Sequence, residues 1–204
     1  LLLLFLFLAA CASTQSVDLE ESRRVVGTES DVRIDAQIFG EKLTTAARIP
    51  MKYDITNERA APIAIADIIP VAEYDPDTQT VTVTIGSEVP GNQLLPRLLT
   101  VMPGEKKTFD TVARVNILVN RAATPNSRFP NGLRVKVNFL SDTEPFKDLI
   151  GISERAVENP QLADVLFPVW LENNETVYTN TLPMRWMFEP EAEPTQRRRS
   201  RRGR

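Results

Sequence analysis

The sequence contains no histidine and only one cysteine among its 204 residues. Histidine is the commonest metal ligand and the usual general base near neutral pH, so its absence excludes serine triads and histidine-ligated zinc. A lone cysteine excludes a disulfide within the chain and a cysteine-based metal site, and without histidine it lacks the base of a cysteine nucleophile. Glycoside hydrolysis by paired carboxylates is the main enzymatic chemistry left, and no spacing among the 27 acidic residues marks such a pair. The sequence therefore predicts a protein that is not an enzyme and needs no metal and no cofactor.

Long apolar runs are equally scarce, and the longest one opens the chain. Residues 1–10 are all apolar, and the single cysteine, Cys11, follows them. This length suits the core of a secretion signal and falls well short of the roughly 20 residues that span a bilayer. No Met and no basic residue precede the run, so we interpret it as a signal peptide truncated at its start. The alternative is a buried apolar helix with a core cysteine, but the polar residues 13–16 offer such a helix no amphipathic continuation.

The residues around the cysteine indicate a lipidation site. Leu8, Ala9, Ala10 and Cys11 resemble the lipobox of bacterial lipoproteins. The resemblance implies that the Cys11 thiol receives a diacylglyceryl group and that signal peptidase II, which recognises the three residues before it, cuts in front of it. In many Gram-negative bacteria an Asp after this cysteine is associated with retention at the inner membrane, and Ala12 stands there instead. For a bacterium with two membranes, the resemblance thus implies a lipid anchor on the periplasmic face of the outer membrane.

Composition divides the rest of the chain into three parts. Residues 11–30 are rich in Ser, Thr, Glu and Arg and contain few large apolar side chains, which predicts a flexible tether behind the lipid. Residues 31–189 carry the apolar patterning of a folded domain and are long enough to form a hydrophobic core. Residues 190–204 are polar and highly charged, so we expect them to be a disordered tail.

Apolar residues alternate with polar ones through most of the domain, which is typical of strands with one buried face. The clearest alternations cover residues 32–38, 49–55, 81–85 and 133–139. A more continuous apolar strand is expected over 62–74, either buried on both faces or bulged at Pro70. The turn formers at 75–78 join it to the strand at 80–85 as a hairpin.

The last third of the domain predicts one helix and one more hairpin. A short helix is expected near residues 159–165, with Pro160 in its first turn. Residues 165–171 and 177–188 are expected to be the two strands of the hairpin.

About eight or nine strands with at most one or two short helices predict an all-β domain built as a two-sheet sandwich. Residues 52–68 resemble the second and third strands of immunoglobulin-like extracellular domains, where a strand ending in Thr-Asn turns into a Pro-Ile strand. The resemblance implies an immunoglobulin-like sandwich that lacks the usual cysteine pair. Such an architecture serves adhesion, assembly, carbohydrate binding and spacing alike, so it selects no function.

Three aromatic residues form a candidate glycan site. Trp170, Tyr178 and Trp186 fall in the expected last hairpin and could present a platform for a sugar ring. The alternative is that they pack in the core or at its rim, since Trp170 stands between two apolar neighbours.

Two polar motifs have plainer interpretations. Residues 75–80 cluster oxygen ligands of the kind calcium needs, but they lack the glycine and the distal glutamate of the twelve-residue calcium loop, which favours a hairpin turn. Residues 174–176 match the N-glycosylation pattern, and we expect an ordinary turn there.

The end of the chain carries dense positive charge. Six of the 24 basic residues are arginines in the last eight positions, and without them the net charge falls from −3 to −9. They are Arg197, Arg198, Arg199, Arg201, Arg202 and Arg204. Such a block attracts anionic lipid, lipopolysaccharide or an acidic protein, with gains of about 1 kcal/mol per residue at a membrane surface. Nucleic acid is not expected as a partner, because an exported protein seldom meets it; the alternative is a solvated tail that pairs transiently with the acidic residues before it.

Together these features predict an envelope-anchored lipoprotein that works as a non-catalytic binding or assembly module, with the membrane and another envelope protein as partners. Proline in the expected strands, at Pro50, Pro168 and Pro183, suits sheet edges to which a partner's strand could be added. The alternative is a protein that binds peptidoglycan or polysaccharide, with a carboxylate-based glycan hydrolase as a weaker variant of it.

Overall fold

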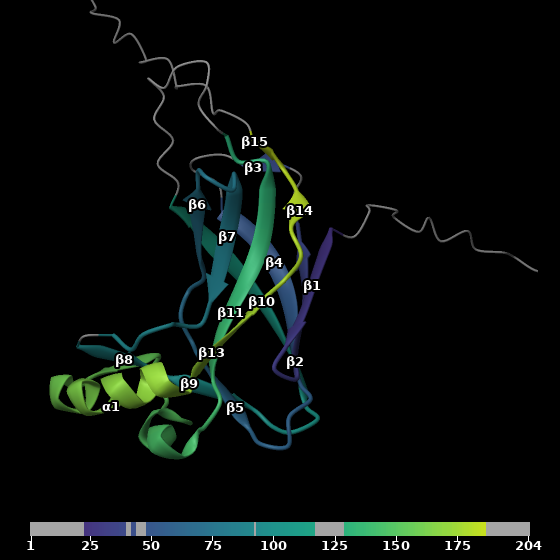
Figure 1. Cartoon of the computed structure of the whole chain (residues 1–204). Coiled ribbons are helices and arrows are strands. Elements are labelled where there is room, and N and C mark those ends of the chain that lie inside the picture. The colour runs from purple at the N-terminus through teal and green to yellow at the C-terminus, as the bar shows by residue number, and fades with distance from the viewer. Residues whose placement is uncertain (1–22, 40–41, 44–47, 92, 117–128, 187–204) are drawn as a thin grey trace, which may run out of the picture.

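The computed structural model describes residues 23–39, 42–43, 48–91, 93–116 and 129–186 (Figure 1). Within them lie fifteen strands, the 3-10 helix η1 (Glu144–Leu149) and the α-helix α1 (Pro160–Asn173). The strands are β1 (Arg24–Glu29), β2 (Val32–Ile38), β3 (Lys42–Leu43), β4 (Arg48–Asn57), β5 (Ile63–Ala66), β6 (Val71–Asp75), β7 (Thr80–Ile85), β8 (Leu94–Pro96), β9 (Leu98–Val101), β10 (Lys106–Asn116), β11 (Gly132–Leu140), β12 (Ala156–Glu158), β13 (Asn174–Tyr178), β14 (Leu182–Pro183) and β15 (Arg185–Trp186). The fold is mostly β, as the sequence predicts.

Eleven of these strands form one sheet. Nine lie in the order β1-β2-β4-β10-β6-β7-β11-β5-β9, and β13 and β14 also pair with β11. Two ladders are parallel, between β10 and β6 and between β11 and β7. Within the described residues, β8 pairs with β12 and β3 with β15 in two small separate sheets. These ladders show one large sheet, and they do not establish the finer prediction of an immunoglobulin-like sandwich of two sheets.

The large sheet curls until its first strand meets the segment that follows β13 (Figure 1). The Asn180 amide donates to the Val26 carbonyl oxygen at 3.0 Å, and the Val26 amide donates to Oδ1 of Asn180 at 2.7 Å. Gly27 permits this approach, because a Cβ there would lie 2.1 Å from the carbonyl oxygen of Tyr178. β1 therefore belongs to the folded domain, whereas the sequence analysis placed residues 24–29 in the tether.

The concave side of the sheet holds the main core. The alternating apolar residues of β2, β4, β7 and β11 are all buried, with exposures of 7% or less, as their period-two patterns predict. They are Val32, Ile34, Ala36, Ile38, Ile49, Met51, Tyr53, Ile55, Val81, Val83, Ile85, Leu133, Val135, Val137 and Phe139. Most of the residues between them are partly or fully exposed, so these strands have one buried face over most of their length.

A second core lies under α1, in the lobe beside one end of the sheet (Figure 1). Ala163, Leu166 and Trp170 of α1 are buried, and their spacing of three and four residues places them on one face of the helix. They share a cluster with Phe146 and Leu149 of η1. The rings of Phe146 and Trp170 meet edge to face, with centroids 5.5 Å apart.

The helix corrects the predicted last hairpin. It starts where the sequence indicates, since Oδ1 of Asn159 accepts a hydrogen bond from the Leu162 amide at 3.0 Å and Pro160 occupies the first turn. It then continues through residues 165–171, which were predicted to be a strand, and β13 pairs with β11 instead. A helix places Ala163, Leu166 and Trp170 on one face, which a strand cannot do with this spacing, and the packing of the second core therefore decides between the two.

The predicted strand over 62–74 is also divided. β5 is buried on both faces, as expected, but residues 67–70 leave the sheet before β6 begins. The hairpin of β6 and β7 is confirmed, with Asp75 opposite Thr80. Residues 67–69 of this connection between β5 and β6 form one wall of an open groove.

Candidate functional site

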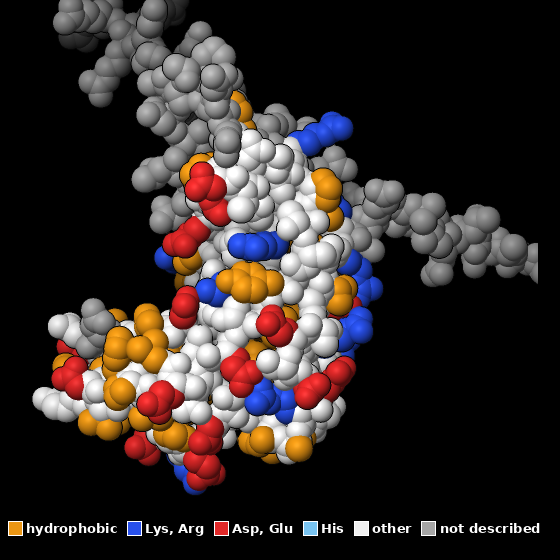
Figure 2. Space-filling view, in the orientation of Figure 1, with side chains coloured by type: hydrophobic (Ala, Val, Ile, Leu, Met, Phe, Trp, Pro, Cys, Tyr) orange, Lys and Arg blue, Asp and Glu red, His pale blue; other side chains and the backbone are white. Residues whose placement is uncertain are grey.

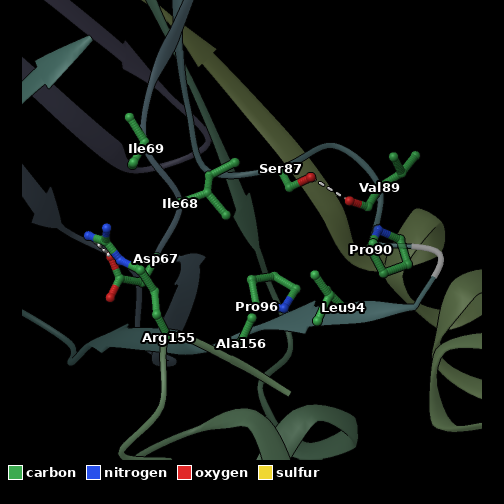
Figure 3. Close-up of a pocket in the computed structure, with 11 residues that line it drawn as sticks. Asp67, Ile68, Ile69, Ser87, Val89, Pro90, Leu94, Pro96, Arg155 and Ala156 are labelled. Carbon is green, nitrogen blue, oxygen red and sulfur yellow. Dashed lines mark hydrogen bonds and ion pairs between the residues drawn. The ribbon is translucent and has the colours of Figure 1, made fainter. Parts of the chain in front are cut away.

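An open groove of about 510 Å³ lies where four segments meet at the junction of sheet and lobe (Figure 3). These segments are the β5–β6 connection, the loop after β7, strand β8 and the start of β12. The lining residues are Asp67, Ile68, Ile69, Ser87, Val89, Pro90, Gly91, Leu94, Pro96, Arg155 and Ala156. The volume falls within the range of about 300–1,000 Å³ that is typical of small-molecule sites.

Most of the groove surface is aliphatic and open to solvent. Leu94 is 59% exposed, Val89 is 45% exposed, and Ile68 and Ile69 are each 37% exposed. Figure 2 shows apolar side chains gathered over the lobe that carries α1 and β8. Single exposed apolar residues are common, but a concave group of them is typical of a binding surface.

Charge is confined to one end of the groove. In Figure 3, Asp67 and Arg155 lie at one end and Val89 and Pro90 at the other, with Pro96 and Leu94 between them. The two charged residues belong to a cluster with Arg97, which connects β8 to β9. We call Asp67, Arg97 and Arg155 the charged cluster.

Both oxygens of Asp67 are used within the charged cluster. Oδ2 accepts from Nε of Arg97 at 3.1 Å and also from its Nη2, and Oδ1 accepts from Nη2 of Arg155 at 3.1 Å. The backbone holds the three residues together, because the Asp67 amide donates to the Arg97 carbonyl and the Arg97 amide to the Arg155 carbonyl, both at 2.8 Å. The cluster is therefore positioned by main-chain bonds as well as by its charges.

Burial alone would raise the pKa of the Asp67 carboxyl. The hydrogen bonds and positive charges of Arg97 and Arg155 outweigh this effect and hold that pKa below its usual value. Asp67 is consequently ionised near neutral pH, so two guanidinium groups face one carboxylate. Within the charged cluster one positive charge is in excess, and Arg155 is the more exposed guanidinium, with its side chain 60% exposed against 30% for Arg97.

The loop after β7 is fastened to the second core. The indole Nε1 of Trp170 donates to the Ser87 carbonyl at 3.2 Å, and the Ser87 hydroxyl donates to the Val89 carbonyl. Trp170 itself is fully buried. The groove wall thus rests on packed side chains of α1, which favours a preformed site over one that must assemble on binding.

Two of the three aromatic residues of the predicted glycan platform, Trp170 and Tyr178, lie in different parts of the structure. Trp170 is in the second core, while Tyr178 is 41% exposed on the outer face of the sheet. The guanidinium carbon of Arg134 lies 4.7 Å from the Tyr178 ring centroid, and Nζ of Lys136 lies 5.9 Å from it. Trp186 ends β15, and its side chain lies outside the described part of the structure. For Trp170 the alternative prediction, packing in the core, is confirmed. A sugar ring could not stack on its buried indole.

The remaining polar motifs are structural. Residues 75–80 form the β6–β7 turn, where Asp75 accepts from the Asp77 amide at 2.9 Å and from the Thr78 hydroxyl at 2.8 Å. In the described residues, no three carboxylates gather as a metal site would require. Residues 174–176 lie in β13, paired with β11, so the turn predicted there is wrong.

The proposed lipidation and charge sites lie outside the described residues. This holds for Cys11, for Leu8, Ala9 and Ala10 before it, and for the six arginines of the tail. Within the described residues, no helix has the length and apolar character needed to traverse a bilayer.

The groove was missed by the sequence analysis. The one signal for it is the pair Ile68 and Ile69, which follows a charged residue and precedes Pro70. Proline interrupts strand pairing, so an apolar pair beside it can lie outside the sheet. Both isoleucines instead fall in the strand predicted over residues 62–74.

Comparison of the chain with protein-family models, with curated proteins and with solved structures finds no match. The description of this protein therefore rests on its fold and its groove. It is a mostly β protein with a helical lobe and an aliphatic groove that is positively charged at one end.

Proposed function

We propose that this protein is a non-catalytic binding module, held at the outer membrane of a bacterial envelope by a lipid on Cys11, and that its groove holds another envelope component. The groove is the observation that carries the binding proposal. Four exposed aliphatic residues line one concave site, and covering a side chain of this kind contributes about 1.5–3 kcal/mol when its burial is complete. The four side chains are already about half buried, so a partner that fills the groove would gain about half of this free energy for each of them.

The membrane part of the proposal is supported by the sequence. The residues from Leu8 to Cys11 resemble a lipobox, and the arginine block of the tail would add attraction to anionic lipid. A lipid and a basic segment together hold a protein at a membrane more firmly than either signal alone. The immunoglobulin-like architecture also stays a proposal, supported by the end of β4 at Asn57, the short turn after it and β5, which follow the order that the resemblance implies.

Glycan binding has less support. It would rest on Tyr178 and Trp186, because Trp170 is buried in the second core. Cations from Arg134 and Lys136 already lie against the Tyr178 ring, and a sugar would have to compete with them for it.

The anchor is tested by the intact mass of the protein purified from membranes of its own host, with Cys11→Ser alongside. We expect a mature chain that begins at Cys11 and carries diacylglyceryl and acyl mass, and we expect the variant to lose both this mass and its membrane association. A chain that keeps residues 1–10 and carries no lipid would overturn the anchor.

The binding role is tested by photo-crosslinking in host cells. A photoreactive residue placed at Leu94, in the groove, should form adducts with an envelope component. Val165, which is 66% exposed on α1, is the matched control because it does not line the groove. Equal labelling at both positions, or none at Leu94, would contradict a binding role for the groove.

A further inference from the structure

We infer that the ligand of the groove is a single-chain anionic amphiphile, with its hydrocarbon chain along the aliphatic wall and its anionic head at the charged cluster. This inference rests on the proposed function and names the chemical class of the ligand. The groove joins two kinds of surface in one line, an aliphatic wall and a cationic end (Figure 3).

The wall is suited to hydrocarbon. Its exposed members are Ile68, Ile69, Val89 and Leu94, and none of the eleven lining residues is aromatic. Sugars and nucleobases are usually held by stacking on aromatic rings together with several directed hydrogen bonds. The polar side chains that line the groove are Asp67, Ser87 and Arg155, and the Ser87 hydroxyl already donates to the Val89 carbonyl. A chain of methylene groups requires none of these bonds.

An added peptide strand fits the groove less well. Such a strand needs free backbone N–H and C=O groups along an edge. The strand that lines the groove is β8, which pairs with β12 along one edge and borders the groove with Leu94 and Pro96, the two residues on one of its faces. Pro96, which lines the groove, has no N–H to donate.

The cationic end is suited to an anionic head group. Arg155 makes one hydrogen bond from its guanidinium to Asp67 among the described residues, at 3.1 Å, and its side chain is 60% exposed. A guanidinium has five N–H donors in a planar fork that matches a carboxylate or a phosphate. Because Arg97 also pairs with Asp67, Arg155 can turn donors toward a ligand while Asp67 stays paired.

The test is titration of the full chain carrying Cys11→Ser, so that no lipid of its own competes, with carboxylates of eight, ten and twelve carbons below their micelle concentrations. Each buried methylene contributes about 0.8 kcal/mol, so we expect about fourfold tighter binding per added methylene until the groove is filled. Dodecanol should bind at least tenfold more weakly than dodecanoate, because it has no charge to pair with Arg155.

Matched variants locate the site. Leu94→Gln should weaken dodecanoate binding about tenfold, whereas Val165→Gln, at a similarly exposed position on α1, should leave it unchanged. Arg155→Gln should weaken dodecanoate about tenfold and leave dodecanol unchanged, with Lys147→Gln, whose side chain is 66% exposed, as its control. Dodecyl phosphate and a lysophospholipid, titrated in parallel, distinguish a free amphiphile from a lipid as the source.

Equal affinity for dodecanoate and dodecanol, or equal losses in the groove variants and their controls, would overturn the inference. If photo-crosslinking at Leu94 captures a protein while no amphiphile binds, the binding module stands and the ligand class is wrong. If Leu94 captures nothing and no amphiphile binds, both proposals fail.

Discussion

At the scale of single residues, Asp67 connects the groove to the stability of the fold. Its side chain is mostly buried, and two guanidinium groups share its carboxylate. Removing the negative charge leaves Arg97 and Arg155 close together without a counter-charge. The stability of this region should therefore depend on the ionisation of Asp67.

Asp67→Asn should destabilise the protein by about 2 kcal/mol at pH 7, the order expected for losing hydrogen bonds to a charged group. The pKa of Asp67 is lowered in the folded state, so its stabilisation is present above the unfolded pKa of about 3.9 and is lost as pH falls through the folded value. Urea unfolding at several pH values should show a constant difference from pH 7 to about 5 and a smaller one below about pH 4. Asp148→Asn, at an exposed position in η1, is the control, and a difference that grows toward low pH would contradict the assignment.

Trp170→Phe should cost about 1–2 kcal/mol, because it removes the hydrogen bond to the Ser87 carbonyl and part of the packing against Phe146. Tyr178→Phe changes an exposed side chain and should stay within about 0.5 kcal/mol of wild type. Chemical denaturation of both variants measures this contrast. Similar small losses in the two variants would argue against a core role for Trp170.

At the scale of elements, β1 and α1 are two of the elements for which the structure differs from the prediction. β1 closes the curl of the sheet against the segment after β13, and α1 covers the second core. Each depends on one identifiable local feature, the close approach at Gly27 for β1 and the Asn159 cap for α1.

Gly27→Ala should cost about 1–3 kcal/mol, because its Cβ would overlap the Tyr178 carbonyl oxygen and push β1 away from its neighbour. Thr28→Ala, at the exposed next position, should change the midpoint of thermal unfolding very little. Amide exchange should also speed up at Val26 and Asn180 in the Gly27 variant only. Unchanged protection at both amides would show that the close approach is not needed.

Asn159→Ala should cost about 1 kcal/mol, since it removes the side-chain acceptor of the Leu162 amide at the start of α1. Asn159→Asp keeps an acceptor there and adds a negative charge at the helix N-terminus, so it should restore the stability. Thermal unfolding of the pair tests the cap. Equal losses in the two variants would indicate that the side chain matters for another reason.

At the scale of the whole molecule, the described residues divide into two cores of different size. The main core contains 23 buried apolar residues inside the curled sheet, and the second contains ten between α1, η1, β8, β9 and the adjoining strands. The smaller core has less apolar burial to hold it together, so the lobe should open at a lower free energy than the sheet.

Native-state hydrogen exchange should therefore find amides of β4 and β11 exchanging only through global unfolding, while those of α1 and β12 exchange through local opening of the lobe. Trp170→Phe should accelerate exchange in α1 more than in β11, because it weakens only the second core. Exchange in α1 as slow as in β11, with the same denaturant dependence, would show a single cooperative unit.

The amino-acid sequence determined the features that depend on neighbouring residues alone. The period-two alternation of residues 32–38, 49–55, 81–85 and 133–139 predicted strands with one buried face, and the turn at 75–78 predicted the β6–β7 hairpin. The proposed lipid site at Cys11 likewise depends on sequence alone.

Tertiary structure decided what depends on distant partners. The parallel ladders of β10 with β6 and of β11 with β7 join segments that no local pattern relates. Residues 165–171 fit a strand or a helix by their apolar content, and the second core selected the helix. The groove belongs to this group as well, because the same isoleucines that a continuous strand would bury are exposed once residues 67–70 leave the sheet. A local pattern can specify which side chains share a face, but only the packed chain determines which of those faces remains uncovered.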